Sequence, residues 1–314
     1  MKKFILSVVC LMMIGIQSVN AQVAIATLHH NDSVTIFSAS AIQKAVDAAV
    51  PGDTIYLSEG MFGGFKVLKP IVMIGTGQST NISGNTTIGK YGSADYKMEA
   101  GLLISGMNFI QNVYFYGQLD GIKIHQCKIV GTIRFYGKSI NNSYSYCNFT
   151  NIDFLLSQMK TLSLCDEVQG LTVYASKIGS VSYDGADEGS VTIVNCNVSS
   201  AGGGSNNGYV NCIVAKAGSG VYQNCLYNQT SGSPVFYNCY KNTELKLDDD
   251  LNCSMSDDEL KAAGYTGVDN TWVGINGGEV PFTLVMPVVQ VTEHSVEVDQ
   301  AEKKLKVSLK LGNK

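Results

Sequence analysis

Met107–Tyr174 repeats one phrase four times, as MNFIQNVYFY (Met107–Tyr116), CKIVGTIRFY (Cys127–Tyr136), CNFTNIDFL (Cys147–Leu155) and CDEVQGLTVY (Cys165–Tyr174). The first residues of the phrases lie 20, 20 and 18 positions apart. A fixed period near twenty indicates a solenoid, and the alternation of apolar and polar residues within each phrase is typical of strands. A coil this short, built only of strands and turns, predicts an all-β solenoid of the parallel β-helix type.

The alignment of the four phrases also predicts the outer surface, because the side chains of a strand alternate between its two faces. Val113 and Phe115 begin the inward columns, so their neighbours should face solvent. One outward column then holds Tyr114, Arg134, Asp153 and Thr172, and the next holds Tyr116, Tyr136, Leu155 and Tyr174.

Residues 1–21 have the pattern of a secretory signal peptide. Lys2 and Lys3 precede an apolar run, and Val19-Asn20-Ala21 offers a small-residue cleavage site. The apolar run is too short to span a bilayer, and no later run is long enough. The sequence therefore predicts an exported protein without a membrane span, located in the periplasm, outside the cell or on its surface. Its β-helix domain is expected at 22–280, with a small strand appendage at 281–314.

The composition argues against nucleic acid as a partner. Without the signal peptide, the chain holds 20 Lys and Arg against 26 Asp and Glu, a net charge of −6, and Arg134 is the only arginine. Nucleic acids and anionic membranes attract basic surfaces, which this balance does not provide.

A short helix is predicted before the first strand. Ser40 and Gln43 suggest a capping box, and Pro51-Gly52 ends the helix. AIQKAVDAAVPGDTIYLSEGMF (Ala41–Phe62), followed by KPIVMIGTG (Lys69–Gly77), resembles the first turn of secreted right-handed parallel β-helix proteins, the pectin-lyase-like group. The resemblance implies that the helix plugs the N-terminal end with its apolar face inward. It implies no chemistry, and Asp53 is interpreted as a turn residue.

The C-terminal half has its own repeat, formed by the pairs Asn195-Cys196, Asn211-Cys212, Asn224-Cys225 and Asn238-Cys239. Their spacings of 16, 13 and 14 residues predict two strands per turn but do not fix the register. A short helix is expected at Ser256–Ala263, and three alternating segments between Val288 and Leu311 are expected to form the appendage.

Eight cysteines remain after the signal peptide. Stacked coils lie about 4.8 Å apart, which a disulfide between Cys127 and Cys147 could bridge. A parallel stack rarely aims both sulfurs correctly, so the sequence favours a ladder of inward thiols that pack as small apolar groups. The Asn that precedes many of these thiols is expected to form a structural ladder at a bend.

Arg134 and Asp153 are the candidate catalytic residues, because the alignment makes them neighbours in one outward column. The resemblance implies enzymes that act on acidic polysaccharides along such a face. Lyases of that kind pair a basic residue with carboxylate-bound calcium, and hydrolases use clustered aspartates. No further carboxylate stands in the column, so the sequence favours an exposed ion pair, worth under about 1 kcal/mol.

Tyr114, Tyr116, Tyr136 and Tyr174 are the candidate ligand-binding residues. Exposed rings one coil apart can stack on successive sugar rings, and each phenol adds a hydroxyl. An aromatic ladder can also simply stabilise a sheet, and the sequence leaves both interpretations open.

Asp184, Asp187 and Glu188 have the composition of a calcium loop but not the spacing of one. A solvated turn is favoured, so the sequence predicts no metal site and no cofactor, with calcium as the one ion that these residues would suit. The predicted function is a secreted or surface-associated module that binds a polysaccharide or other glycan. The alternatives are a polysaccharide lyase or glycoside hydrolase, and an adhesin-like spacer.

Overall fold

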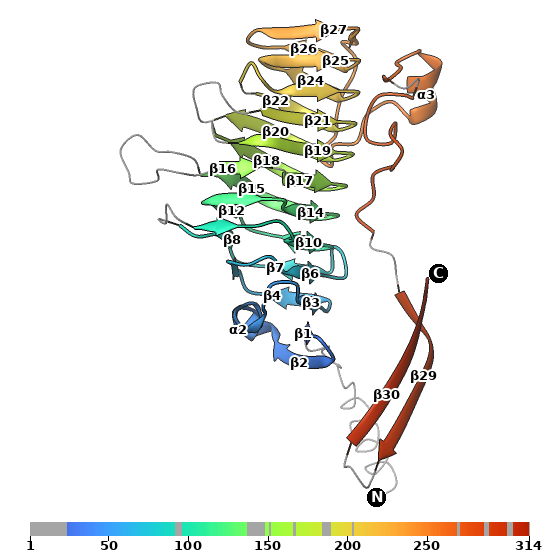
Figure 1. Ribbon diagram of the computed structural model, residues 1–314. Coiled ribbons are helices and arrows are strands. Elements are labelled where there is room, and N and C mark those ends of the chain that lie inside the picture. The colour runs from blue at the N-terminus through green and yellow to red at the C-terminus, as the bar shows by residue number, and fades with distance from the viewer. Residues whose placement is uncertain are drawn as a thin grey trace, which may run out of the picture.

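The computed structural model describes residues 24–91, 96–136, 148–150, 152–165, 168–183, 190–202, 204–268, 271–285, 289–299 and 304–313. They form a parallel β-helix whose rungs stack from the N-terminal helix α2 to strand β27 (Figure 1). The predicted fold class is confirmed. The predicted signal peptide lies outside the described residues, and no described helix is long and apolar enough to cross a membrane.

Two long sheets form the stack. The first sheet has twelve strands, in the order β2 (Ser33–Ser38), β1 (Ile25–His30), β3 (Thr54–Leu57), β6 (Val72–Ile74), β10 (Leu103–Ser105), β14 (Lys123–His125), β17 (Ile152–Leu155), β19 (Gln169–Tyr174), β21 (Ser190–Val194), β23 (Gly208–Val210), β25 (Gly220–Gln223) and β27 (Pro234–Tyr237). The second has thirteen: β28 (Tyr240–Lys241), β26 (Leu226–Thr230), β24 (Ile213–Ala217), β22 (Asn197–Ala201), β20 (Lys177–Tyr183), β18 (Gln158–Leu164), β15 (Lys128–Phe135), β11 (Asn108–Phe109), β7 (Thr80–Ile82) and β4 (Gly60–Phe62), with β12 (Val113–Tyr116), β8 (Thr86–Gly89) and β5 (Lys66–Val67) joined to β15.

Smaller elements complete the described chain. A third sheet holds β16 (Asn148–Thr150), β13 (Gln118–Asp120) and β9 (Lys97–Met98), and β29 (Val289–Asp299) pairs antiparallel with β30 (Lys304–Asn313). The helical segments are η1 (Ala39–Ala41), α2 (Ile42–Ala48) and α3 (Asp257–Ala262). The described part of the predicted segment VVQVTE thus belongs to the same strand as SVEVD, β29, and the predicted short helix is α3.

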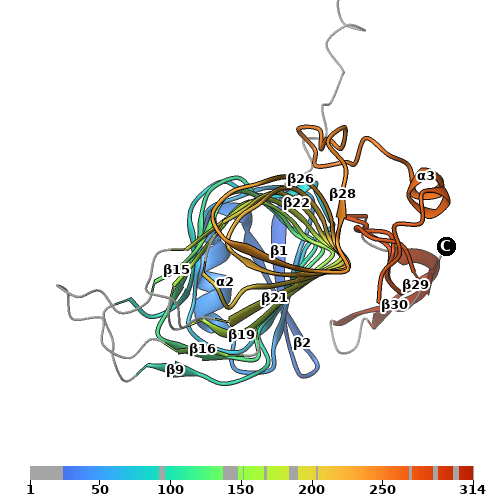
Figure 2. The ribbon, with the colours of Figure 1, turned by 90° about the horizontal axis from the view of Figure 1, so that it is seen from above.

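A one-residue bend between the two sheets sets the register of each rung. Its residue has a left-handed backbone with φ between 43° and 54°, a conformation that Asn tolerates better than most residues. The residue after the bend is buried in every rung except the last, where Cys239 is partly buried. Viewed along the stack, the rungs superpose closely (Figure 2). The bend residues are Gln126, Leu156, Ala175, Asn195, Asn211, Asn224 and Asn238.

The predicted register is wrong after Tyr136. Ser157 and Ser176, not Cys147 and Cys165, occupy the position that follows the bend. The rung from Cys127 to Ser157 is 30 residues long, so an insertion displaces the phrase that begins at Cys147, a residue outside the described ranges. The Asn-Cys pairs, in contrast, mark successive full rungs, each with one strand in each long sheet, as the prediction of two strands per turn requires.

The inward thiol ladder is confirmed for Cys196, Cys212, Cys225 and Cys239, which are free cysteines in consecutive rungs. The backbone N–H of Cys212 donates to the Sγ of Cys225, and that of Cys225 to the Sγ of Cys239, both at 3.4 Å. Each thiol donates in turn to a backbone carbonyl at 3.2–3.3 Å, as Cys212 does to Val210. These thiols therefore act as structural donors and acceptors in the core. Burial also raises the pKa of the Cys127 thiol, to about 12, which keeps it protonated.

The N-terminal end is covered by α2 and the β1–β2 hairpin. Ile42, Ala45 and Val46 of the helix are buried against the core. The predicted capping box is wrong, because η1 precedes the helix and no side chain caps it. Gln43 instead ties the helix to β5, where its Oε1 accepts from the backbone N–H of Lys66 at 2.7 Å.

Asp53 acts as a turn residue. Its carboxylate accepts from the backbone N–H of Val50 at 2.8 Å and lies 2.7 Å from Nδ1 of His30. Burial raises the pKa of this carboxyl, but the contacts with Val50 and His30 outweigh burial and hold the pKa below its usual value.

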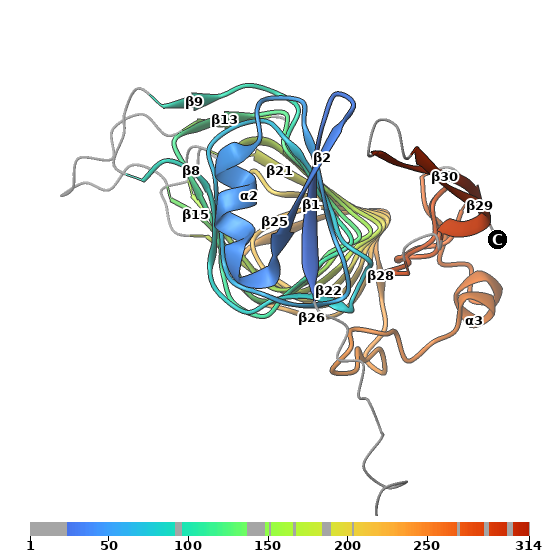
Figure 3. The ribbon, with the colours of Figure 1, turned by 90° about the horizontal axis from the view of Figure 1, so that it is seen from below.

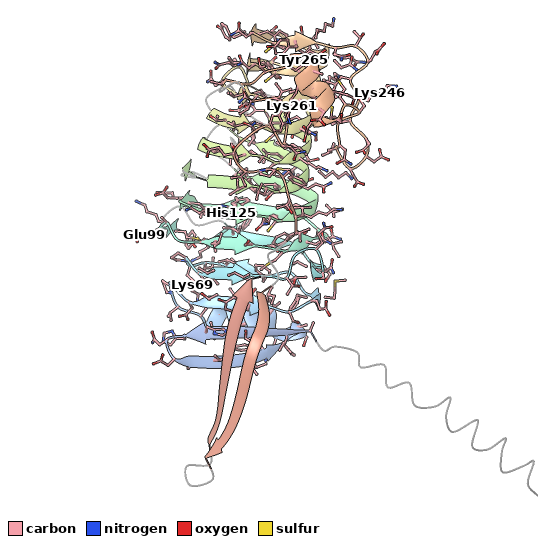
Figure 4. All side chains as sticks on the ribbon, turned by 90° about the vertical axis from the view of Figure 1, so that its right-hand side faces the viewer. Lys69, Glu99, His125, Lys246, Lys261 and Tyr265 are labelled. Atoms are coloured by element: carbon pink, nitrogen blue, oxygen red, sulfur yellow. The ribbon has the colours of Figure 1, made fainter. Side chains whose placement is uncertain are left out.

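Residues 245–268 and 271–285 form a C-terminal strap that runs back along the bends (Figure 1). The Nδ2 of Asn228 donates to the carbonyl of Leu245 at 2.7 Å, and the Nε2 of Gln126, several rungs away, donates to that of Val285 at 3.2 Å. Lys261 and Tyr265, labelled in Figure 4, lie beside the last rungs. WVGINGG, which begins at Trp272, is therefore part of the strap. A capping box between Ser256 and Glu259 begins α3.

Two stacked tyrosines in the core offer a matched test of hydroxyl burial. The fully buried rings of Tyr209 and Tyr222 are parallel, with centroids 4.6 Å apart. Tyr222 Oη donates to the carbonyl of Gly218 at 3.0 Å, whereas Tyr209 Oη has no hydrogen-bond partner among the described residues.

We expect Tyr222→Phe to lower the free energy of unfolding by about 1 kcal/mol, because it removes a buried hydrogen bond. Tyr209→Phe removes an unpaired buried hydroxyl, so it should leave stability unchanged or raise it by about 1 kcal/mol. Urea denaturation of both variants checks this. An equal loss in the two variants would show that the Tyr209 hydroxyl is satisfied.

Candidate ligand-binding surface

The structure separates the two candidate catalytic residues. Arg134 lies in the second sheet, opposite Tyr114 on one side and Ser163 on the other. Asp153 lies in the first sheet, opposite Lys123 and Thr172. The predicted shared column is therefore wrong, because the insertion after Tyr136 places the next phrase on the other sheet.

Tyr174 is also separated from the other candidate tyrosines. It lies in β19 of the first sheet, between Leu155 and Val194. Its hydroxyl lies against Gly278 of the C-terminal strap, where a Cβ would collide with it. The structure therefore brings together Tyr114, Tyr116 and Tyr136, but not Tyr174.

A tyrosine cluster, defined by Tyr91, Tyr114, Tyr116 and Tyr136, covers the outer face of β12. Val113 and Phe115 are buried, so the alternation of the strand turns Tyr114 and Tyr116 outward. The rings of Tyr116 and Tyr136 are parallel, with centroids 4.8 Å apart and 7° between their planes. Tyr114 lies 5.7 Å from Tyr136, and Tyr91 meets Tyr116 edge-on at 5.2 Å. Tyr91 is 58% exposed, and the other three are half-buried.

Polar side chains border the tyrosine cluster. The Nδ2 of Asn112 donates to Tyr114 Oη at 2.8 Å, while its Oδ1 accepts from the backbone N–H of Thr132, also at 2.8 Å. The guanidinium carbon of Arg134 lies 5.7 Å from the ring centroid of Tyr136. Arg134 is exposed, so the cluster has one cationic edge. Tyr91 and Asn112 were missed in the sequence, although Asn112 stands two residues before Tyr114 and therefore on the same face of the chain.

Two phenols of this region, those of Tyr116 and Tyr96, have a raised pKa. Burial, and then the neighbouring Tyr136, raise the pKa of Tyr116 well above its usual value. Burial raises the pKa of the nearby Tyr96 to about 12. The hydroxyl of Tyr116 can therefore donate a hydrogen bond as well as accept one.

The geometry of the tyrosine rings is not the one expected for stacking on successive sugar rings. Because the faces of Tyr116 and Tyr136 contact each other, no sugar ring can stack between them. The most exposed ring of the cluster is that of Tyr91, and the other three rings are half-buried. Such a surface suits a ligand with many hydroxyl groups, whose donors and acceptors can pair with the phenols.

The structure does not test the calcium candidates. Asp184, Asp187 and Glu188 lie outside the described residues. Within the described ranges, no group of three or more His, Cys, Asp or Glu side chains is arranged to hold a metal ion.

Comparison with protein-family models, with curated proteins and with solved structures gave no match to this chain.

Proposed function

We propose that this protein is an exported or surface-associated β-helix of the pectin-lyase-like group that binds glycans through the tyrosine cluster. The observation that carries the proposal is the gathering of four tyrosines on one outer face, with the paired rings of Tyr116 and Tyr136 at its centre. Extended glycan chains fit the flat face of a β-helix, which supports side chains at regular intervals and keeps them in place.

Arg134 suggests which glycans bind best. A guanidinium pairs with carboxylates in a bidentate geometry, and this one lies 5.7 Å from the ring centroid of Tyr136. We therefore expect acidic polysaccharides, with uronic acid units, to be preferred over neutral ones.

The enzymatic alternative depended on Arg134 and Asp153 lying side by side. The two residues lie in different sheets, so this alternative has lost its candidate catalytic pair. The spacer alternative remains, and it predicts that replacing the tyrosines changes no binding property. One experiment separates this alternative from the proposal.

That experiment measures binding to a glycan array and then determines affinities for the retained glycans by calorimetry. Tyr116→Ala with Tyr136→Ala should weaken binding at least about tenfold, equivalent to about 1.4 kcal/mol. Tyr56→Ala is the matched control, because Tyr56 is 44% exposed but lies in the first sheet. Arg134→Gln should reduce the preference for acidic over neutral glycans. Retention of no glycan, or equal affinity in the double variant and the control, would reject the proposal.

A further inference from the structure

The C-terminal end of the stack differs from the N-terminal end. At the N-terminus, α2 and the β1–β2 hairpin lie across the rungs (Figure 3). At the other end, β27 and β28 form the last rung, and Figure 1 draws no element beyond β27. The strap and α3 lie beside the stack rather than over this end.

The edge strand β27 of the last rung exposes apolar side chains and carries no charge, whereas β28 of the same rung ends at the exposed Lys241. Val235 is 46% exposed and Tyr237 is 57% exposed, and both lie on the outer face of β27. Between them, Phe236 is only partly buried and stacks on Tyr227, with centroids 4.3 Å apart. Residues 220–240 contain no Asp, Glu, Lys or Arg. Natural edge strands are usually protected by charged side chains against pairing with another chain, so this edge lacks the usual protection.

The backbone of β27 is suited to pairing. The carbonyl of Tyr237 accepts from the N–H of Asn224 at 2.9 Å, so it points toward the stack. Backbone groups of successive strand residues point to opposite edges, and the N–H and C=O of Phe236 therefore point to the open side. Pro234 has no N–H to offer, but it lies at the start of the strand, two residues before Phe236.

We propose that this end binds a second copy of the chain, tail to tail, with β27 antiparallel to β27 of the second copy about a twofold axis at Phe236. In that arrangement each Phe236 exchanges two backbone hydrogen bonds with its symmetry mate. Val235 then stands opposite Tyr237 of the other copy, an aromatic and β-branched pair that stabilises antiparallel strands. No like charges meet between the two β27 strands, and the core continues through the two Phe236 rings.

The strand sequence favours a second copy over an unrelated partner because it is self-complementary about Phe236. A twofold contact also closes after two copies. A head-to-tail contact would instead place β27 on β2, whose Val34 is 56% exposed, and would build filaments. That arrangement is an alternative outcome of the test.

The first experiment measures the mass of the purified chain by sedimentation over a wide range of concentration. We expect a shift from one chain to two chains and no larger species. The variant with Val235→Lys and Tyr237→Lys should remain at the mass of one chain. Val221→Lys is the matched control, because Val221 precedes Val235 by one rung in the same outward column and is 36% exposed. Circular dichroism confirms that each variant is folded.

The second experiment tests the register by disulfide trapping. Opposed residues in a non-hydrogen-bonded antiparallel pair have Cα atoms about 4.5 Å apart, within the range of a disulfide. Val235→Cys with Tyr237→Cys should therefore give a covalent dimer under mild oxidation. Val235→Cys alone should give no covalent dimer. The wild-type chain is the control for cross-linking through the native Cys239.

Three outcomes would overturn the proposal. The chain could remain a monomer at every concentration, or the double-cysteine variant could fail to cross-link while dimers still form. A mixture of Val34→Cys and Val235→Cys chains could also cross-link, which would show head-to-tail stacking instead.

Discussion

Phe115→Ala should lower the free energy of unfolding by about 3–5 kcal/mol. Phe115 is fully buried, and its ring stacks on Phe135 of the next rung at 4.5 Å, with 18° between the planes. It also meets Phe154, of the first sheet, edge-on at 6.3 Å. Removal of the ring leaves a cavity between two rungs, which the stacked strands cannot close without losing their hydrogen bonds.

Urea denaturation gives this loss directly, with Phe115→Leu as the control. Leucine keeps much of the buried volume, so its cost should be clearly smaller than that of alanine. A loss below about 1 kcal/mol for Phe115→Ala would show that the rungs collapse around the missing ring.

Asn211→Ala should destabilise the protein by about 2–5 kcal/mol. Asn211 has a left-handed φ of 54°, which costs alanine about 1–2 kcal/mol. Its buried side chain also holds the strap, since its Oδ1 accepts from the N–H of Val268 at 2.9 Å. The loss of that acceptor adds about 1–3 kcal/mol.

A second bend separates these two contributions. Asn224 has nearly the same φ, 51°, and no described partner for its Oδ1. We therefore expect Asn224→Ala to lower stability only through the cost of a left-handed backbone at alanine, about 1–2 kcal/mol. Asn211→Gly keeps the left-handed bend and loses only the hydrogen bond to the strap. Its loss of stability should therefore be smaller than that of Asn211→Ala. Thermal unfolding of the three variants measures these losses of stability. Equal losses in Asn211→Ala and Asn224→Ala would show that the hydrogen bond to the strap contributes nothing to stability.

Local features of the fold were predictable because they depend on short-range patterns. The helix before Pro51-Gly52 lies with its apolar face inward as predicted, and Val113 and Phe115 point inward as their alternation requires. Alternation fixes the face of a residue without fixing the rung to which it belongs. Inward and outward assignments can therefore survive an error in register.

The register could not be predicted because the bend has no single sequence signature. Asn marks it in the last rungs, but Leu156 and Ala175 adopt the same left-handed backbone without any turn signal. The candidate site shows the consequence. Tyr116 and Tyr136 were correctly paired, since no insertion lies between their rungs, whereas Asp153 and Tyr174 were assigned to the wrong sheet.

The C-terminal strap has a consequence for the order in which the chain assembles. Its residues contact rungs from Gln126 to Asn228, so it can dock only after those rungs exist. A chain synthesised from its N-terminus can stack each new rung on the one before it, starting from the covered end. The strap then arrives last and holds rungs that were completed much earlier. We expect unfolding to reverse this sequence, with the strap released before the rungs separate.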